Sequence, residues 1–138
     1  MIATRKLAFH TEGENDIINI TENVQRLLTE SGIEEGFVLL FLQSTTSSLG
    51  IMEFEEGLIR DIPASLSRLA PNDADYEHEK AYGDGNARSH VKSYVLGADL
   101  VVPFKDCKLL LGTWQQIVLS EFDVRPRERN LIVQIVSG

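Results

Sequence analysis

Runs and alternations of apolar residues predict a chain built mainly from β-strands. Residues 2–10 are expected to form a first strand, with Leu7 and Phe9 on one face. Residues 36–43 (GFVLLFLQ) are apolar almost throughout, which predicts a strand buried on both faces at the core of the sheet. Residues 49–54 resume the strand pattern. We expect a closing meander of three more strands, at residues 99–104, 108–122 and 130–137.

Apolar residues at helical spacing predict two main helices, the first of which follows the first strand. Val24 and Leu28 share one face of this helix, and either Asn19 or Thr21 can cap its start. We expect it to end at Gly32, because glycine adopts the left-handed backbone of a helix terminus without strain.

The second main helix is expected over residues 55–69. Pro63 lies inside it and has no N–H to donate, which predicts either a kink or a fresh helix start capped by Asp61. The polar segment 71–89 is predicted to be a long connection, and connections of that length are usually functional or disordered. A short helix is expected over residues 90–96.

These elements predict a single domain over residues 1–138, of the α+β class, built on a predominantly antiparallel sheet or sandwich. Strands outnumber helices, and several strands have apolar residues on both faces. Two helices cover little of such a sheet. The remaining apolar surface is therefore expected to be covered by an oligomer interface or by helices that wrap more completely than their lengths indicate.

Composition and charge narrow the class of protein. The 43% apolar and 25% charged fractions are typical of a globular domain, and no apolar run or signal-peptide core points to a membrane, so we expect a cytoplasmic protein. Cys107 is the only cysteine, which excludes an intrachain disulfide. The net charge of −8 opposes nucleic-acid binding. One basic cluster suits a phosphate or pyrophosphate, or is simply a solvated turn: Arg125, Arg127 and Arg129.

Two histidines, His78 and His90, bracket a loop that contains residues 83–86 (GDGN). Histidines near carboxylates can bind a divalent metal or transfer protons, although this spacing matches no compact metal motif and loop histidines are common on plain surfaces. Asn86 can donate to and accept from a heterocycle or a phosphate, or can serve as a turn residue.

Other polar residues at predicted strand ends are candidates for binding or catalysis. The hydroxyls of Thr45 and Thr46 suit phosphate oxygens, although such turns also occur without ligands. Glu121 is placed to act as a general base or metal ligand, or to be a solvated strand end. Nucleophilic catalysis has little support, because no Gly-x-Ser-x-Gly turn and no phosphate-binding loop motif is present.

The segment Gly112-Thr-Trp114-Gln115 interrupts an apolar run. Glycine lets the backbone bend or lets a ligand approach closely. Trp114 offers a flat apolar face and one N–H donor, and Gln115 offers a donor and an acceptor. The alternative is a tryptophan packed in the core of a sheet.

This segment resembles the GTWQ motif of the YjbQ-like family, which has been linked to a secondary thiamine-phosphate synthase activity. The resemblance runs from about residue 21 to the C-terminus. Two residues depart from the family pattern: Ser44 stands where a histidine is expected, and Met52 stands where an asparagine is usual. The other matches are residues 44–53, 56–61, 76–78, 86–90 and 121–127.

The resemblance implies a homotrimer and a transferase that joins a pyrimidine pyrophosphate to a thiazole phosphate and releases pyrophosphate. Mg²⁺ or another divalent metal ion would assist, with His78 and His90 as its candidate ligands. The catalytic residues would be His78, His90 and Glu121. The substrate-binding residues it implies are Thr45, Thr46, Asn86, Trp114, Gln115, Arg125 and Arg127, and Arg88 would help to neutralise the leaving group.

Two other functions stay open at this stage. Ser44 in place of histidine favours a non-catalytic trimeric module that binds a small phosphorylated metabolite or a metal ion, because a lost proton carrier need not abolish binding. Metal-assisted hydrolysis by His78, His90 and a carboxylate is a third possibility. The partner in each case is a small molecule, with no nucleic acid and no membrane.

Overall fold

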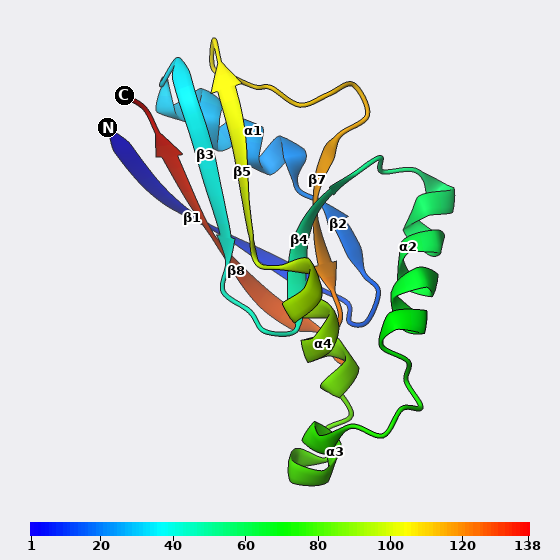
Figure 1. The fold of residues 1–138 in the computed structure, drawn as a ribbon. Helices are drawn as coiled ribbons and strands as arrows, with labels where there is room; N and C mark the ends of the chain where they lie inside the picture. Colours follow the sequence, from blue (N-terminus) through cyan, green and yellow to red (C-terminus); the bar gives the residue numbers. More distant parts are fainter.

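The computed structural model describes all of residues 1–138 and contains two antiparallel sheets and four helices (Figure 1). The α+β class predicted from the sequence is confirmed. In chain order the elements are β1 (Ile2–Thr11), β2 (Ile17–Asn19), α1 (Thr21–Ser31), β3 (Glu35–Leu42), β4 (Ser47–Met52), α2 (Glu56–Leu69), α3 (Glu77–Tyr82), α4 (Ala87–Leu96), β5 (Asp99–Lys105), β6 (Lys108–Leu109), β7 (Gln116–Glu121) and β8 (Arg127–Val136).

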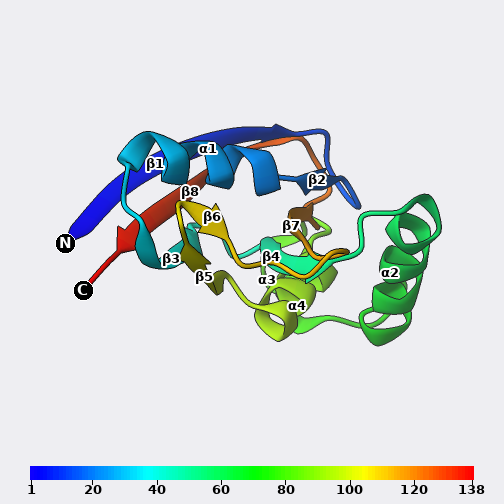
Figure 2. The same ribbon diagram turned by 90° about the horizontal axis from the view of Figure 1, so that it is seen from above.

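The larger sheet has the strand order β1-β8-β3-β5-β6, and the smaller sheet has the order β2-β7-β4. The larger sheet curls around α1, as the view from above shows (Figure 2). Alternate residues of each strand point inward, so that Leu40, Val133 and Leu131 pack with Val24 and Leu28 of α1 in one core. None of the four helices combines the length and the apolar character of a membrane-spanning segment.

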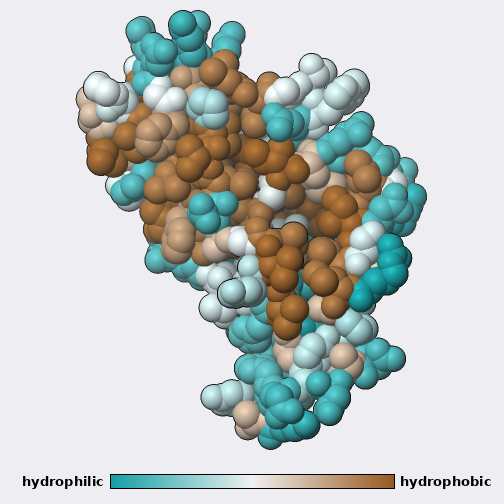
Figure 3. All heavy atoms as spheres, viewed as in Figure 1, coloured by the Kyte–Doolittle hydropathy of each residue, from teal (hydrophilic) through white to brown (hydrophobic).

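The central strand β3 is buried on one face, which corrects the prediction of burial on both. Val38, Leu40 and Leu42 lie in the core, whereas Phe37 and Phe41 are 40% and 49% exposed. No helix of the same chain lies over this outer face of the sheet. Figure 3 shows apolar side chains gathered over β3 and β5, and again over α4.

The predicted meander at the C-terminal end of the chain is wrong. β5 and β6 form a hairpin, but β7 pairs with β2 and β4 in the smaller sheet, and β8 lies between β1 and β3. The predicted strand at residues 108–122 is also interrupted. The Gln115 side chain accepts the Gly112 N–H at 2.8 Å and closes a turn between β6 and β7.

The helices agree with the prediction except at Pro63 and in the long connection. Gly32 has a φ of 68° and ends α1 as expected. α2 runs unbroken through Pro63, so no new helix starts at Asp61; instead the Glu55 carboxylate caps α2. The predicted loop holds α3, and α4 begins at Ala87 rather than at residue 90.

Candidate functional site

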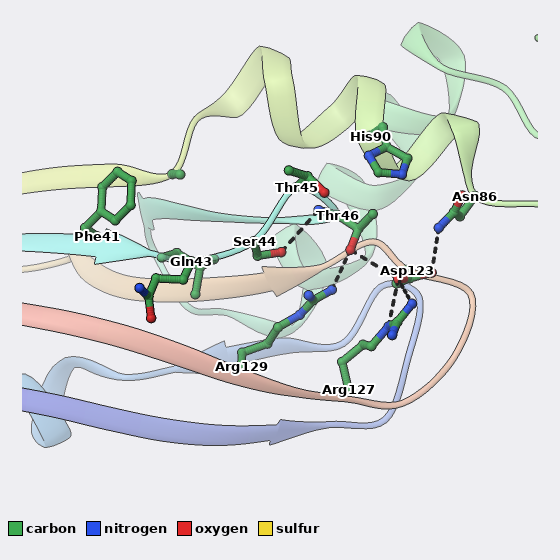
Figure 4. Close-up of a pocket in the computed structure, with 12 residues that line it drawn as sticks. Phe41, Gln43, Ser44, Thr45, Thr46, Asn86, His90, Asp123, Arg127 and Arg129 are labelled. Carbon is green, nitrogen blue, oxygen red and sulfur yellow. Dashed lines mark hydrogen bonds and ion pairs between the residues drawn. The ribbon is translucent and has the colours of Figure 1, made fainter. Parts of the chain in front are cut away.

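A cleft of about 760 Å³ opens where the end of β3, the start of β8 and the helix α4 meet (Figure 4). It gathers residues that are far apart in the sequence, because β8 lies beside β3 and α4 contacts β4. The residues that line the cleft are Phe41, Leu42, Gln43, Ser44, Thr45, Thr46, Asn86, His90, Ala98, Asp123, Arg127 and Arg129.

Asp123 is the centre of the hydrogen-bond network in the cleft, and it is 1% exposed. Arg127 donates to its Oδ2 from Nε at 2.8 Å, with Nη2 also at 2.8 Å, and the Thr46 hydroxyl donates to the same oxygen at 3.1 Å. Burial by itself raises the pKa of the Asp123 carboxyl, but the hydrogen bonds from Val124 and Arg127, with the Arg127 charge, outweigh it and lower the pKa. Asp123 therefore holds Arg127 in place as an ionised partner.

An Asp123→Asn substitution tests this pairing through the pH dependence of stability. The folded-state pKa is lowered, so the stabilisation by Asp123 is complete above the unfolded pKa of about 4 and is lost as the pH falls through the folded value. We expect the free energy of unfolding of the variant to be about 2 kcal/mol lower than that of the native protein at pH 7. Urea denaturation at pH 7 and at about pH 3 should show this difference shrinking. A difference that is the same at both pH values would contradict the assignment.

Arg129 and Glu121 form a buried ion pair beneath the cleft. Arg129 donates from Nε to Glu121 Oε1 at 2.7 Å and from Nη2 to Oε2 at 2.6 Å, and the Thr11 hydroxyl donates to Oε1 at 2.7 Å. Glu121 is 0% exposed and does not line the cleft. A further hydrogen bond, from Arg129 Nη2 to Thr46 Oγ1 at 2.7 Å, joins this pair to the Asp123 network. The position of Glu121 favours a structural role over the catalytic role implied by the family resemblance.

His90 lines the cleft and His78 lies behind it. The two rings meet edge to face, with their centroids 4.7 Å apart. His78 Nε2 lies 3.2 Å from the Asn86 side-chain oxygen and 3.5 Å from Asp84 Oδ1. The Asn86 amide nitrogen donates to Asp123 at 3.4 Å, and turning the amide over exchanges this contact for hydrogen bonds to Asp84 and His78. Asn86 thus connects the histidine pair to the cleft network.

The side chains near the histidines do not form a metal site by themselves. No group of three or more His, Cys, Asp or Glu side chains in the structure is placed to hold a metal ion. The Asp123 carboxylate is already used by Arg127, Thr46 and Asn86. The metal predicted on His78 and His90 would therefore need further ligands from a bound molecule.

Several residues predicted for the site lie elsewhere in the chain. Trp114 is 71% exposed, and Gln115 is used in the turn with Gly112. Arg88 is bound to Glu14 through two hydrogen bonds, at 2.6 and 3.0 Å, and Arg125 is exposed outside the cleft. None of these four residues lines the cleft.

Two charged residues of the cleft were not predicted as site residues: Asp123 was not singled out, and Arg129 was named only as part of the basic cluster. The alternation of side chains along a strand could have identified both residues from the sequence. Residues two apart on a strand share a face, so Arg129 lies on the same face of β8 as Arg127. Glu121 and Asp123 are likewise two apart at the end of β7, which places two carboxylates opposite two guanidiniums.

Comparison with known proteins defines the family. A family model described as UPF0047 protein YjbQ-like matches residues 5–138. The chain belongs to the UPF0047, YjbQ-like family. A UPF0047 protein from Archaeoglobus fulgidus is 40% identical over 129 residues, covering 94% of this chain and 98% of the relative. The UPF0047 protein YugU from Bacillus subtilis is 32% identical over 133 residues, covering 96% and 98%.

Solved structures of the UPF0047 family share the fold. A protein from Sulfolobus solfataricus, described as YbjQ-like and of unknown function, has a TM-score of 0.88 with 26% identity and covers 100% of both chains. A UPF0047-family protein from Clostridium acetobutylicum has a TM-score of 0.82 with 31% identity, covering 94% of this chain and 99% of that one. The resemblance identified from the GTWQ segment is confirmed, and the family match begins before residue 21, within β1.

Proposed function

We propose that the cleft binds a small phosphorylated metabolite. The observation that carries this proposal is that the Arg127 guanidinium is held by Asp123 while part of it stays exposed. Its side chain is 36% exposed at the cleft, and Asp123 holds its Nε and Nη2. A guanidinium has five N–H donors in a rigid fork, so Nη1 is left to face a ligand. A fixed guanidinium loses little conformational freedom when it binds a phosphate.

The hydroxyl and amide groups around Arg127 supply further partners for phosphate oxygens. Thr45 and Asn86 line the same cleft, and His90 faces it from α4. Each guanidinium of the cleft is paired with one carboxylate, Arg127 with Asp123 and Arg129 with Glu121. Affinity therefore depends on oriented N–H and O–H donors rather than on excess positive charge, and its dependence on salt is expected to be shallow.

We further propose, from the family resemblance, that the chemistry at this cleft is a thiamine-phosphate synthase-type transfer. A pyrimidine pyrophosphate and a thiazole phosphate would be joined with release of pyrophosphate. Such a displacement needs the leaving group to be neutralised and two rings to be aligned. Arg127, which lines the cleft, would donate hydrogen bonds to the leaving pyrophosphate, and His90, with His78 behind it, would hold or move a proton.

A non-catalytic binding module is the second candidate, and Ser44 is the observation that favours it. Ser44 lines the cleft where the family histidine is expected. Its hydroxyl oxygen accepts the Thr46 N–H at 3.1 Å and lies 2.5 Å from the Ser47 hydroxyl that donates to it, so it stabilises the turn rather than serving as a base. The cleft then retains its phosphate donors but lacks one imidazole.

An Arg127→Gln substitution tests phosphate binding. Loss of a charge-assisted hydrogen bond is expected to weaken binding of a phosphorylated ligand by about 10- to 100-fold. Calorimetric titration with thiazole phosphate measures the change. Arg125→Gln is the matched control, because it removes the same charge from an exposed neighbour outside the cleft. Equal losses in both variants would show that binding follows net charge and not the cleft.

A condensation assay separates the two candidates. The native protein and Ser44→His are each incubated with the pyrimidine pyrophosphate and the thiazole phosphate, with and without Mg²⁺. Turnover by the native protein supports the transferase. Turnover by Ser44→His alone supports the binding module, because the site then lacks only the imidazole. Absence of turnover by both the native protein and Ser44→His, with thiazole phosphate bound normally, would contradict the transferase reaction.

We also propose that the chain assembles as a homotrimer, as the family resemblance implies. Two features support assembly: the apolar outer face of β3 with Phe37 and Phe41, and the helix α2, whose leucine and isoleucine side chains are not buried within the chain. Light scattering should give a mass three times that of the 15.4 kDa chain. A monomer mass at micromolar concentration would contradict this proposal.

A further inference from the structure

A second cavity, of about 500 Å³, adjoins the cleft on the side of α4. The two share four residues, Ser44, Thr45, His90 and Ala98, so they are parts of one larger depression. The second cavity is here called the α4 cavity. Its other lining residues are Ser93, Tyr94 and Gly97.

The α4 cavity differs chemically from the cleft. The cleft contains Arg127, Arg129 and Asp123, whereas no arginine, lysine or carboxylate lines the α4 cavity. The Ser93 hydroxyl donates to the Ser47 carbonyl oxygen at 2.7 Å, so it is already satisfied within the chain. Apart from this serine and from Ser44, Thr45 and His90, which it shares with the cleft, the lining consists of the Ala98 methyl group, the backbone of Gly97 and the ring of Tyr94. Such a surface suits an uncharged group better than a phosphate.

Tyr94 is an aromatic residue that the fold leaves open to a ligand. It is 91% exposed, the most exposed large side chain of α4. His90 and Tyr94 are four residues apart on the same helix and therefore share one face. With a rise of about 1.5 Å per residue, they are about 6 Å apart along the helix axis. His90 lines both cavities, so a ligand with a short connection between its ring and its phosphate can occupy the two together.

We infer that the α4 cavity is a second subsite, which binds a flat aromatic or heteroaromatic group of the ligand against the ring of Tyr94. The phosphate of the same ligand lies in the cleft, beside Arg127. The ligand class is therefore a phosphorylated aromatic molecule with one short connection between ring and phosphate. This inference rests on the proposed function, since the position of the phosphate fixes the position of the ring.

The test compares two ligands of equal charge, phenyl phosphate and glycerol phosphate, by calorimetric titration at the same ionic strength. The native protein is expected to bind phenyl phosphate more tightly. Tyr94→Ala should weaken binding of phenyl phosphate by roughly three- to tenfold and leave binding of glycerol phosphate unchanged. Tyr94→Phe should keep the native preference, because stacking needs the ring and not the hydroxyl. Because the Tyr94 side chain is so exposed, neither variant is expected to disturb folding.

Val95→Ala is the matched control. Val95 is the next residue of α4, is 54% exposed and lines neither cavity, so its substitution should leave both affinities unchanged. Equal binding of the two ligands by the native protein, with no effect of Tyr94→Ala, overturns the subsite but leaves the proposed phosphate site standing. Failure of both ligands to bind overturns the proposed function, and the subsite with it.

Discussion

A Glu121→Ala substitution is expected to lower the free energy of unfolding by about 3–5 kcal/mol at neutral pH. Glu121 is 0% exposed and accepts two hydrogen bonds from Arg129. Removing the carboxylate leaves the Arg129 guanidinium, whose side chain is 10% exposed, without a counter-charge in a buried site. The Thr11 hydroxyl and the Asp123 N–H lose an acceptor in the same step. Urea denaturation followed by circular dichroism measures the change.

Glu128→Ala is the control for this effect, because Glu128 is the residue of β8 next to Arg129. Its side chain is 71% exposed and pairs with His10 at the surface, so its loss is expected to cost about 1 kcal/mol or less. Native stability of Glu121→Ala, together with loss of ligand turnover, would contradict the structural assignment. Glu121 would then regain the catalytic role implied by the family resemblance.

A Gly36→Ala substitution is expected to destabilise the larger sheet by about 3 kcal/mol or more. Gly36 lies in β3 between β5 and β8, with a φ of 154°. A Cβ atom at this position would lie 1.9 Å from the Val136 carbonyl oxygen. Because that oxygen belongs to the backbone of a neighbouring strand, the clash can be relieved only by moving β3 relative to β8.

Gly50→Ala is the matched control in the other sheet. A Cβ atom there would lie 3.9 Å from Val118 Cγ2, which is ordinary van der Waals contact. Alanine is therefore expected to be neutral at residue 50, or slightly stabilising, because it restricts the unfolded chain more than glycine does. Thermal unfolding of the two variants side by side tests the comparison. A Gly36→Ala protein as stable as Gly50→Ala would show that β3 and β8 do not approach as closely as described.

The sequence predicted the elements of this fold better than their arrangement. β1, α1 and β3 lie within about two residues of their predicted bounds, because alternation and helical spacing are local properties. The pairing of β8 with β1 depends on contacts more than 100 residues apart along the chain, which no local pattern encodes. For the same reason the buried inner face of β3 could be identified from its apolar residues, but its uncovered outer face could not.

The candidate site shows the same division. Thr45, Thr46, Asn86, His90 and Arg127 were predicted as site residues, and the structure brings all five to one cleft. Trp114 and Gln115 were predicted from a motif that identifies the family, yet they lie outside the cleft. They precede the first residue of β7, whereas Asp123, which lines the cleft, follows the last residue of the same strand. A motif reports what a family shares, whereas the shape of a site also depends on which strand ends meet.

Binding of phenyl phosphate, observed in a crystal of the protein, tests the central claim most directly. We predict that the phosphate lies in the cleft within hydrogen-bond distance of Arg127, close to Thr45 and Asn86. The ring should extend toward Tyr94. Ordered ligand at another surface, such as the exposed Trp114 or Arg125, with no ligand in the cleft of a fully soaked crystal, would contradict the assignment of this cleft as the phosphate site.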